Sequence, residues 1–252
     1  MIVKNYQKVV LAGLLTFSSS SLLAVESYSV TDLGTLDENG VFATAINDAN
    51  TAVGYSYLSS LSQESGNVLI NPFHGFAHKN GANIDLGVLA DENSELSMFF
   101  NINNTETAVG VSYVTVERIN NQGNPINAVL QQAIYTSVES GLLNEIPHFL
   151  PENKQNMRAL GINDNNFIVG YSLYNDPDDT NDKGDEINVL QEKSFIYDTD
   201  NDVLTRIENF NGDRRLSRNV LRDVNNSGIA VGWFDEYLTT VITHHASFVP
   251  RK

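Results

Sequence analysis

The sequence predicts an all-β fold built from four repeats. A segment that reads AINDANTAVGYS from Ala45 returns as NINNTETAVGVS from Asn101, GINDNNFIVGYS from Gly161 and DVNNSGIAVGWF from Asp223. Equivalent asparagines in the four copies are separated by 56, 60 and 62 residues, a spacing typical of one supersecondary unit per repeat. Each copy alternates apolar and small residues on both sides of a polar turn, which is the pattern of a β-hairpin.

The turn and the strand that follows it have the same chemistry in each copy. Asn and Asp tolerate the left-handed backbone that a tight hairpin turn needs, and Glu106 in the second copy is the poorest match. A glycine follows the valine of the second strand, where glycine marks a bulge or a close approach of another backbone. These glycines are Gly54, Gly110, Gly170 and Gly232.

A second pair of strands is predicted downstream of each hairpin. It begins with a small residue before a large apolar one, at Gly75, Ala133, Ser194 and Ser247. The first three copies lead into an outer strand, and the fourth has no such partner before Lys252. A counterpart of the missing strand occurs near the N-terminus, where residues 30–34 (VTDLG) repeat residues 83–87 (NIDLG).

These observations predict a four-bladed β-propeller that is closed by pairing of the N-terminal strand with the last blade. The predicted domain covers residues 25–252 as a single unit. Its repeats span approximately residues 37–87, 88–147, 148–208, and 209–252 together with 28–36.

Residues 1–24 read as a secretory signal peptide. Lys4 and Lys8 precede an apolar run over residues 9–17, and small residues ending at Ala24 offer a cleavage point. The run is too short to span a bilayer, although an uncleaved anchor or a buried strand is the alternative interpretation. We therefore expect a secreted or periplasmic protein with no stable membrane anchor after signal cleavage.

Charge and cysteine content exclude several classes of function. Without residues 1–24 the chain keeps 13 basic and 31 acidic residues, a formal charge of −18. Such a chain repels phosphate backbones and anionic lipids, so we expect no nucleic-acid partner, whereas cations and basic partners remain open. The absence of cysteine excludes disulfides, thiolate metal sites and a cysteine nucleophile.

Three motifs resemble the HAF-repeat family of predicted extracellular bacterial proteins. They are Asp32-Leu33-Gly34-Thr35-Leu36, then Ile46-Asn47-Asp48 with Val53-Gly54-Tyr55-Ser56, and His74-Gly75-Phe76. The resemblance covers nearly all of the mature chain and implies export and a repeat fold, but no activity. The histidine of the third motif is replaced by Gln132, Lys193 and Ala246 in the later copies, so it is not a ligand in every repeat.

The predicted crossings between blades each carry an acidic residue. In a closed ring these residues, Glu38, Glu92, Glu152 and Asp213, surround the axis on one face. A ring of oxygen ligands suits Ca²⁺ or a cationic partner. The alternative is that acidic side chains are simply favoured in solvated turns.

The strongest acidic cluster is NDPDDTNDKGDE, residues 175–186. Asp178, Asp179, Asn181 and Asp182 are its candidate Ca²⁺ ligands, but Lys183 and Leu190 occupy ligand positions of the nearest calcium-loop alignment. A solvated insert is the alternative. The five histidines do not form a zinc signature, because a zinc site needs three or four converging ligands.

No sequence signature assigns a catalytic or cofactor-binding residue. The aromatic stripe of Tyr55, Tyr57, Tyr113, Tyr171 and Trp233 is interpreted as packing between blades rather than as a sugar platform. Long loops are predicted at residues 57–72, 113–131 and 173–192, all on one face. We therefore predict a non-enzymatic exported propeller that binds an extracytoplasmic protein or glycan through an acidic loop-rich face. The alternatives are a polysaccharide-active hydrolase or lyase using carboxylates on that face, and a purely structural module.

Overall fold

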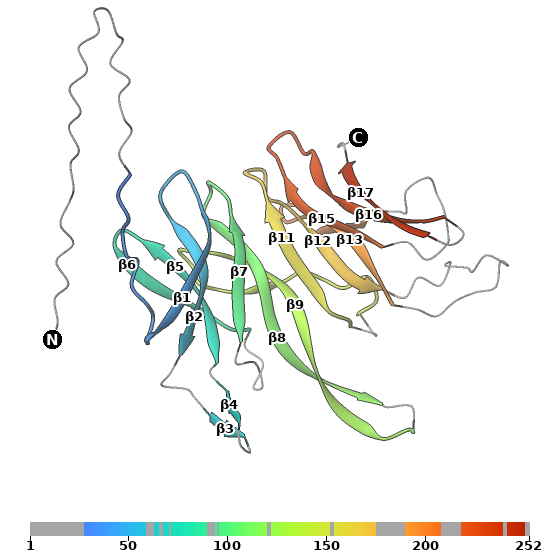
Figure 1. Ribbon diagram of the computed structural model, residues 1–252, viewed down its shortest axis with the longest axis horizontal. Coiled ribbons are helices and arrows are strands. Elements are labelled where there is room, and N and C mark those ends of the chain that lie inside the picture. The colour runs from blue at the N-terminus through green and yellow to red at the C-terminus, as the bar shows by residue number, and fades with distance from the viewer. Residues whose placement is uncertain are drawn as a thin grey trace, which may run out of the picture. The chain divides into compact units, whose positions relative to one another are not determined.

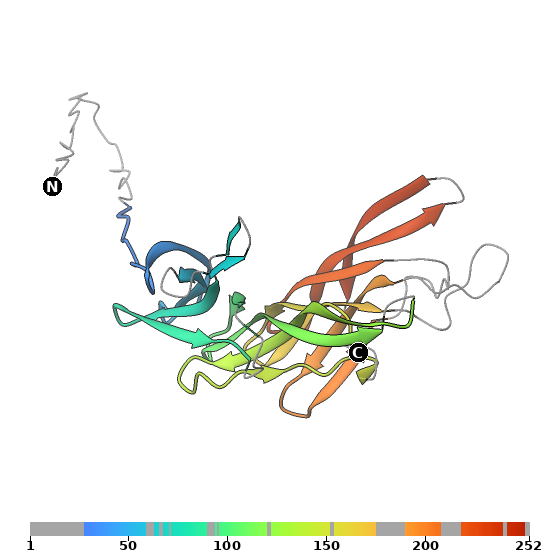
Figure 2. The same ribbon diagram turned by 90° about the horizontal axis from the view of Figure 1, so that it is seen from below.

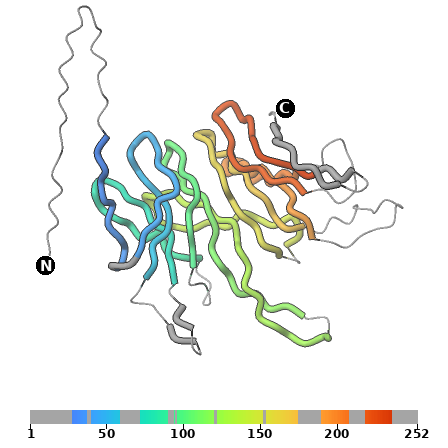
Figure 3. The backbone as a smooth tube through the Cα atoms, viewed as in Figure 1, coloured from blue at the N-terminus to red at the C-terminus, as the bar shows by residue number. Residues whose placement is uncertain are grey.

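The computed structural model describes residues 28–58, 63–65, 68–70, 72–89, 94, 96–119, 122–151, 154–174, 190–207, 218–238 and 241–249 (Figure 1). Figure 3 traces the backbone of the chain in the same view. The chain divides into two units, Met1–Asp32 and Leu33–Lys252, and the strands that the structure describes lie in the second. All described regular structure is β, apart from one residue of 3₁₀ conformation, so the all-β prediction is confirmed. None of the described segments is a helix long and apolar enough to cross a membrane.

Four antiparallel sheets follow one another along the chain, and in each sheet the strands pair in chain order (Figures 1 and 2). The first contains β1 (Glu38–Ile46), β2 (Ala52–Leu58), β5 (Phe73–Lys79) and β6 (Ala82–Gly87). The second contains β7 (Ser97–Ile102), β8 (Thr107–Ile119), β9 (Pro125–Ser137) and β10 (Asn144–Glu145). The third contains β11 (Met157–Ile162), β12 (Phe167–Tyr174), β13 (Gln191–Asp198) and β14 (Val203–Arg206). The fourth has β15 (Asn219–Val224), β16 (Ala230–Leu238) and β17 (Val241–Val249), and a separate hairpin pairs β3 (Gln63–Ser65) with β4 (Val68–Ile70).

The asparagine of each repeat builds the turn between the first two strands of its sheet. Asn103 Oδ1 accepts hydrogen bonds from the backbone N–H groups of Thr105 (3.1 Å) and Thr107 (2.8 Å), and Asn47, Asn163 and Asn225 make the equivalent pair. Three residues after each asparagine the backbone is left-handed, with φ between 59° and 76° at Asn50, Glu106, Asn166 and Gly228. Glu106 therefore adopts the turn conformation in spite of being its least suited residue.

The strand glycines are required by a β-bulge on the neighbouring strand. Opposite Gly170, the pairing of β11 with β12 shifts between Ala159 and Gly161, and the same shift recurs in the other three sheets. A Cβ atom on Gly170 would lie 1.9 Å from the carbonyl oxygen of Arg158, and the three equivalent glycines meet the equivalent carbonyl at 1.9–2.0 Å. The prediction of a bulge and a close backbone approach is confirmed.

The core lies between consecutive sheets. One hydrophobic cluster joins Val53 of the first sheet to Phe99 and Ile102 of the second. A further cluster joins Val109 to Ala159 and Ile162, and another joins Val169 to Leu221 and Val224. None of these clusters of the described residues joins the fourth sheet to the first, so closure of the ring remains a prediction.

The expected pairing of the N-terminal strand with the last sheet is not present in the described residues. Residues 28–36 form no strand, and β17 pairs with β16 alone. The backbone carbonyls of Leu33 and Thr35 instead accept hydrogen bonds from Asn83 Nδ2, at 2.9 and 3.3 Å, on the first sheet. Tyr28 and Val30 have exposed fractions of 88% and 101%.

The prediction of a long loop at residues 113–131 is wrong. Strands β8 and β9 continue through it as a hairpin with 13 residues in each strand. The reason is local: four of the six residues from Val114 to Ile119 are β-branched, a composition that favours strands over loop. The loop predicted at residues 57–72 likewise contains the short hairpin β3–β4.

Candidate functional site

Hydrogen bonds between neighbouring repeats are concentrated at one end of the sheets. We call the end that carries the asparagine turns the turn end, and the opposite end, where β2 leads to β5 and β8 leads to β9, the loop end (Figure 1). At the turn end, the amides of the first three repeat asparagines each donate to the backbone carbonyl of the next asparagine. The three bonds run from Asn47 to Asn103 (3.0 Å), from Asn103 to Asn163 (2.9 Å) and from Asn163 to Asn225 (2.9 Å).

A second row of hydrogen bonds joins the residues that follow these asparagines. The backbone N–H groups of Asp48, Asn104 and Asp164 donate to the side-chain oxygen of the next member, at 2.9, 2.7 and 2.9 Å. The row alternates acid and amide, Asp48–Asn104–Asp164–Asn226. The Asn104 amide also donates to the carboxylates of Asp48 and Asp164, and the Asn226 amide donates to Asp164. Donation from Asn104 and Asn226 lowers the pKa of Asp164 despite the opposing effect of burial.

The polar groups of the turn end are used in hydrogen bonds that hold neighbouring repeats together. The loop end is therefore the candidate binding surface. The loop end bears the β3–β4 hairpin, the far halves of β8 and β9, and the ends of β12, β13, β16 and β17 (Figure 1). Since these connections are the parts of the repeats that differ most from one another, they can give one repeat a property that the others lack.

The predicted acidic ring falls largely outside the described residues. Glu38 begins β1, next to Leu58 at the loop end, and nothing is described of its side chain. Glu92, Glu152 and Asp213 lie outside the described residues. The same is true of the candidate Ca²⁺ ligands Asp178, Asp179, Asn181 and Asp182. In the part of the chain that is described, no three His, Asp or Glu side chains are grouped to hold a metal ion.

Five aromatic side chains form a continuous cluster on the first sheet and on β8 of the second. Phe42 stacks on Tyr55, with ring centroids 5.0 Å apart and an interplanar angle of 16°. Phe73 lies edge-on to Tyr57 (5.9 Å) and to Tyr113 of β8 (6.0 Å). Phe42 is 48% exposed and the others are half-buried.

This aromatic cluster contains three of the five residues of the predicted stripe, together with Phe42 and Phe73, which were not predicted. Their places next to Tyr55 and Tyr57 in the strand register were the available signal, because a residue directly opposite another in an antiparallel pair shares its face. The cluster both packs between repeats and leaves ring surface open. It can therefore contact an apolar or sugar ligand as well as stabilise the first sheet.

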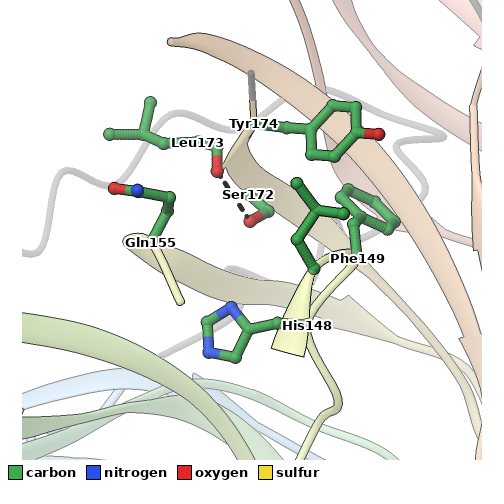
Figure 4. Close-up of a pocket in the computed structure, with 7 residues that line it drawn as sticks. His148, Phe149, Gln155, Ser172, Leu173 and Tyr174 are labelled. Atoms are coloured by element: carbon green, nitrogen blue, oxygen red, sulfur yellow. Dashed lines mark hydrogen bonds between the residues drawn. The ribbon is translucent and has the colours of Figure 1, made fainter. Parts of the chain in front are cut away.

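A small pocket lies at the loop end beside the crossing from the second sheet to the third (Figure 4). Its lining residues are His148, Phe149, Leu150, Gln155, Ser172, Leu173 and Tyr174. The Tyr174 ring is held between Phe149, at 5.3 Å in an edge-on contact, and the Arg206 guanidinium, at 4.9 Å. The pocket has room for little more than one water molecule, far less than a typical ligand pocket.

His148 is the most perturbed titratable group of this pocket. Its Nε2 lies 2.5 Å from Gln132 Oε1, and the Gln132 amide donates to the Ile146 carbonyl at 2.8 Å. The glutamine oxygen is therefore the acceptor and the histidine Nε2 carries the proton. Burial, together with the nearby Lys154 charge, lowers the pKa of His148 to about 4. The neutral imidazole serves as a structural hydrogen-bond donor to Gln132, and the Ser172 hydroxyl of the same pocket donates to the Leu173 carbonyl at 3.2 Å.

Acid is expected to destabilise the protein through His148. Between the ordinary pKa of 6.5 and the folded pKa of about 4, the unfolded chain binds a proton that the folded chain does not, so stability falls as the pH falls through this window. Above pH 6.5 the group contributes no pH dependence. We expect the midpoint of thermal unfolding to fall more between pH 7 and pH 4.5 in the native protein than in His148→Gln. An equal fall in both proteins would contradict the assignment.

Arg218 organises a polar network between the third and fourth sheets. Its guanidinium contacts the buried Asp235 carboxylate through Nε and Nη2, both at 2.7 Å, and lies 3.4 Å from Glu192 and 5.7 Å from the Trp233 ring. The Asp235 carboxylate is buried and bonded to the Arg218 guanidinium, so the pair has a structural role at this position.

In the first sheet, His74 Nδ1 lies 2.9 Å from an Asp85 carboxylate oxygen. Burial raises the pKa of Asp85, but bonds from His74 and Gly87 outweigh it and the net pKa is lowered.

Fold and site together define an all-β protein made of an array of antiparallel sheets with one bonded end and one variable end. The chain belongs to the family described as a protein of unknown function (DUF3466), whose model matches residues 89–244. This match is more than half of the chain and runs from the start of the second repeat into β17. No curated protein matches the sequence. The HAF-repeat resemblance remains a prediction.

Proposed function

We propose that the protein is an exported, non-enzymatic module that binds its partner through the loop end. The observation that carries the proposal is the difference between the two ends. Every repeat uses its turn end for the same bonds to its neighbours, and the insertions that distinguish the repeats leave from the loop end. A repeat protein with a shared scaffold and variable loops at one end typically uses those loops for recognition.

The partner that best fits this end is a glycan or an extracytoplasmic protein with basic or cationic character. The formal charge of −18 without residues 1–24 favours a positively charged partner. The aromatic cluster offers ring faces of the kind that pack on sugars and on apolar side chains. Glu38, Glu92, Glu152 and Asp213 are proposed to add carboxylates to the same end, and residues 178–182 to bind Ca²⁺ weakly.

The finer fold that we propose is a closed four-bladed propeller in which the N-terminal strand completes the last sheet. Two features support it. Leu36 N donates to Ser56 Oγ at 3.2 Å, as Leu89 N, which follows the outer strand β6, donates to Ser112 Oγ at 3.2 Å. Gly34 has φ 71° and Gly87 has φ 70°. Residues 33–36 therefore have the local geometry that follows an outer strand, and in the described residues the fourth sheet is the one with three strands.

Thermal unfolding of the mature protein tests the binding proposal. Residues 25–252 would be titrated with Ca²⁺, Mg²⁺ or EDTA, and separately with extracellular polysaccharides and their oligosaccharides. A ligand at a hundred times its Kd stabilises the folded state by about 2.7 kcal/mol and raises the midpoint. Asp179→Asn combined with Asp182→Asn should abolish a Ca²⁺ shift and leave a glycan shift unchanged.

The outcomes of this experiment separate the possible roles. No shift with any cation would remove the Ca²⁺ site, and no shift with any glycan would leave a protein partner as the binding hypothesis. Release of reducing ends or unsaturated sugars from a polysaccharide would replace the binding module with the enzyme alternative. A Phe42→Ala variant that keeps a glycan shift unchanged would exclude the aromatic cluster from the binding site.

A further inference from the structure

The side of the first sheet that faces away from the second is open, although its residues have the chemistry of an interface. Ile46 is 64% exposed, while its equivalents Ile102, Ile162 and Val224 are 5%, 5% and 6% exposed. These equivalents are buried because the preceding sheet packs on them. Ala43 is likewise exposed, and its equivalents Phe99, Ala159 and Leu221 are buried. We call this side of a sheet its leading face.

The opposite side of the last sheet is open in the same way. Val231 is 45% exposed, whereas its equivalents Val53, Val109 and Val169 have no exposed surface. Each of those valines shares a hydrophobic cluster with the leading face of the following sheet. We call this side the trailing face. The open leading face of the first repeat thus matches the open trailing face of the last.

Both hydrogen-bond rows at the turn end stop at the same two repeats. The amides of Asn47, Asn103 and Asn163 donate to the next asparagine, and the Asn225 amide has no acceptor in the part of the chain that is described. In the second row, the next partner of the Asn226 backbone N–H would be a side-chain oxygen. Acid and amide side chains alternate along this row, so the residue expected after Asn226 is an acid. Asp48 of the first repeat is that acid.

From this match we propose that the first and last repeats bind each other and form a fourth repeat interface within one molecule. The interface seats Val231 against Ala43 and Ile46, brings the Asn225 amide to the Asn47 carbonyl, and brings the Asn226 N–H to Asp48. This inference rests on the closed propeller proposed above and adds a direct contact between two sheets to the pairing of the N-terminal strand.

The occupant of each open face is the other end of the same chain rather than a second copy. Residues 33–36 lie on the first sheet in the geometry of a segment that follows an outer strand, and the fourth sheet lacks an outer strand in the described residues. A sheet that accepts this strand must lie next to the first sheet. Linkage within one chain also makes the association intramolecular, which raises the effective concentration to the millimolar range.

Disulfide trapping tests the interface, because the chain has no cysteine of its own. The test protein carries Asp48→Cys and Asn226→Cys, and the matched control carries Asn104→Cys and Asp164→Cys across an interface that the structure shows. Both are oxidised as dilute mature protein and examined by intact mass and by non-reducing electrophoresis. We expect a disulfide within the monomer in both proteins, with similar yield.

Two results would overturn the inference. One is a control pair that oxidises while the test pair stays reduced, which would mean that the ends remain apart. The other is a test pair that forms disulfide-linked oligomers, which would assign the open faces to a second copy. Neither result affects the ligand-induced shifts of the thermal midpoint, so failure of the interface and failure of the binding proposal are distinguishable.

A second measurement does not depend on cysteine chemistry. If the Asn225 amide bonds to the Asn47 carbonyl, Asn225→Ala removes the same number of bonds as Asn163→Ala. We expect the two substitutions to lower the thermal midpoint by similar amounts. A clearly smaller fall for Asn225→Ala would show that the last repeat ends the array.

Discussion

Phe99→Ala is expected to lower the free energy of unfolding by about 4 kcal/mol. The side chain is fully buried between the first and second sheets, in the cluster that also holds Val53, Leu86 and Ile134. It lies directly over Gly75, where a Cβ atom would come within 2.3 Å of the Phe99 ring. Rigid strands surround the site, so the sheets cannot collapse into the space that the ring leaves.

Urea denaturation followed by circular dichroism measures this loss, and Phe42→Ala is the matched control. Phe42 precedes Ala43, the first-sheet equivalent of Phe99, and is 48% exposed. Its removal should cost about 1 kcal/mol, from the lost stacking on Tyr55. Similar losses for both variants would contradict the packing of the second sheet on the first.

Asn103→Ala is expected to cost about 3 kcal/mol, the second largest effect among these predictions. The buried side chain accepts from the N–H groups of Thr105 and Thr107, and donates to the Asn163 carbonyl at 2.9 Å. Alanine leaves these backbone groups without a partner in a site that is almost closed to water. The loss should appear as a lower denaturation midpoint.

Asn127→Ala controls for the change of asparagine to alanine in this fold. Asn127 lies on β9, is exposed, and makes no side-chain hydrogen bond in the described structure. Its substitution should change the free energy of unfolding by less than about 0.5 kcal/mol. A loss for Asn103→Ala as small as the loss for Asn127→Ala would mean that the inter-repeat bonds do not stabilise the array.

Most of the local structure could be predicted from the repeats. The asparagine turn, the strand on either side of it and the glycine beside the bulge depend on the conformational preferences of a few adjacent residues. Glu106 shows the limit of that reasoning. It adopts φ 62° in the second turn, and its carboxylate bonds to Thr51 and Lys79 of the first repeat. Glu106 thus combines contacts to the neighbouring repeat with a left-handed backbone conformation that glutamate by itself disfavours.

The candidate site was predicted less completely. The sequence predicted which end of the sheets carries the variable segments, because antiparallel strands place alternate connections at opposite ends. It did not predict that Phe42 and Phe73 join Tyr55, Tyr57 and Tyr113, since cross-strand register brings them together. It also did not predict that His148 bonds to Gln132, because these residues belong to a crossing and to an inner strand of the sheet before it.

The sequence by itself determined that the chain is all-β, that it contains four equivalent units, and which residues build each turn. Those features follow from a period of two in strands and from asparagine and glycine at fixed places. Only the tertiary structure decided that the asparagine amides bond from repeat to repeat. It also decided that Ile46 and Val231 are open where their equivalents are buried. Burial and hydrogen bonding between repeats depend on which sheet lies beside which, and no property of a single residue specifies that.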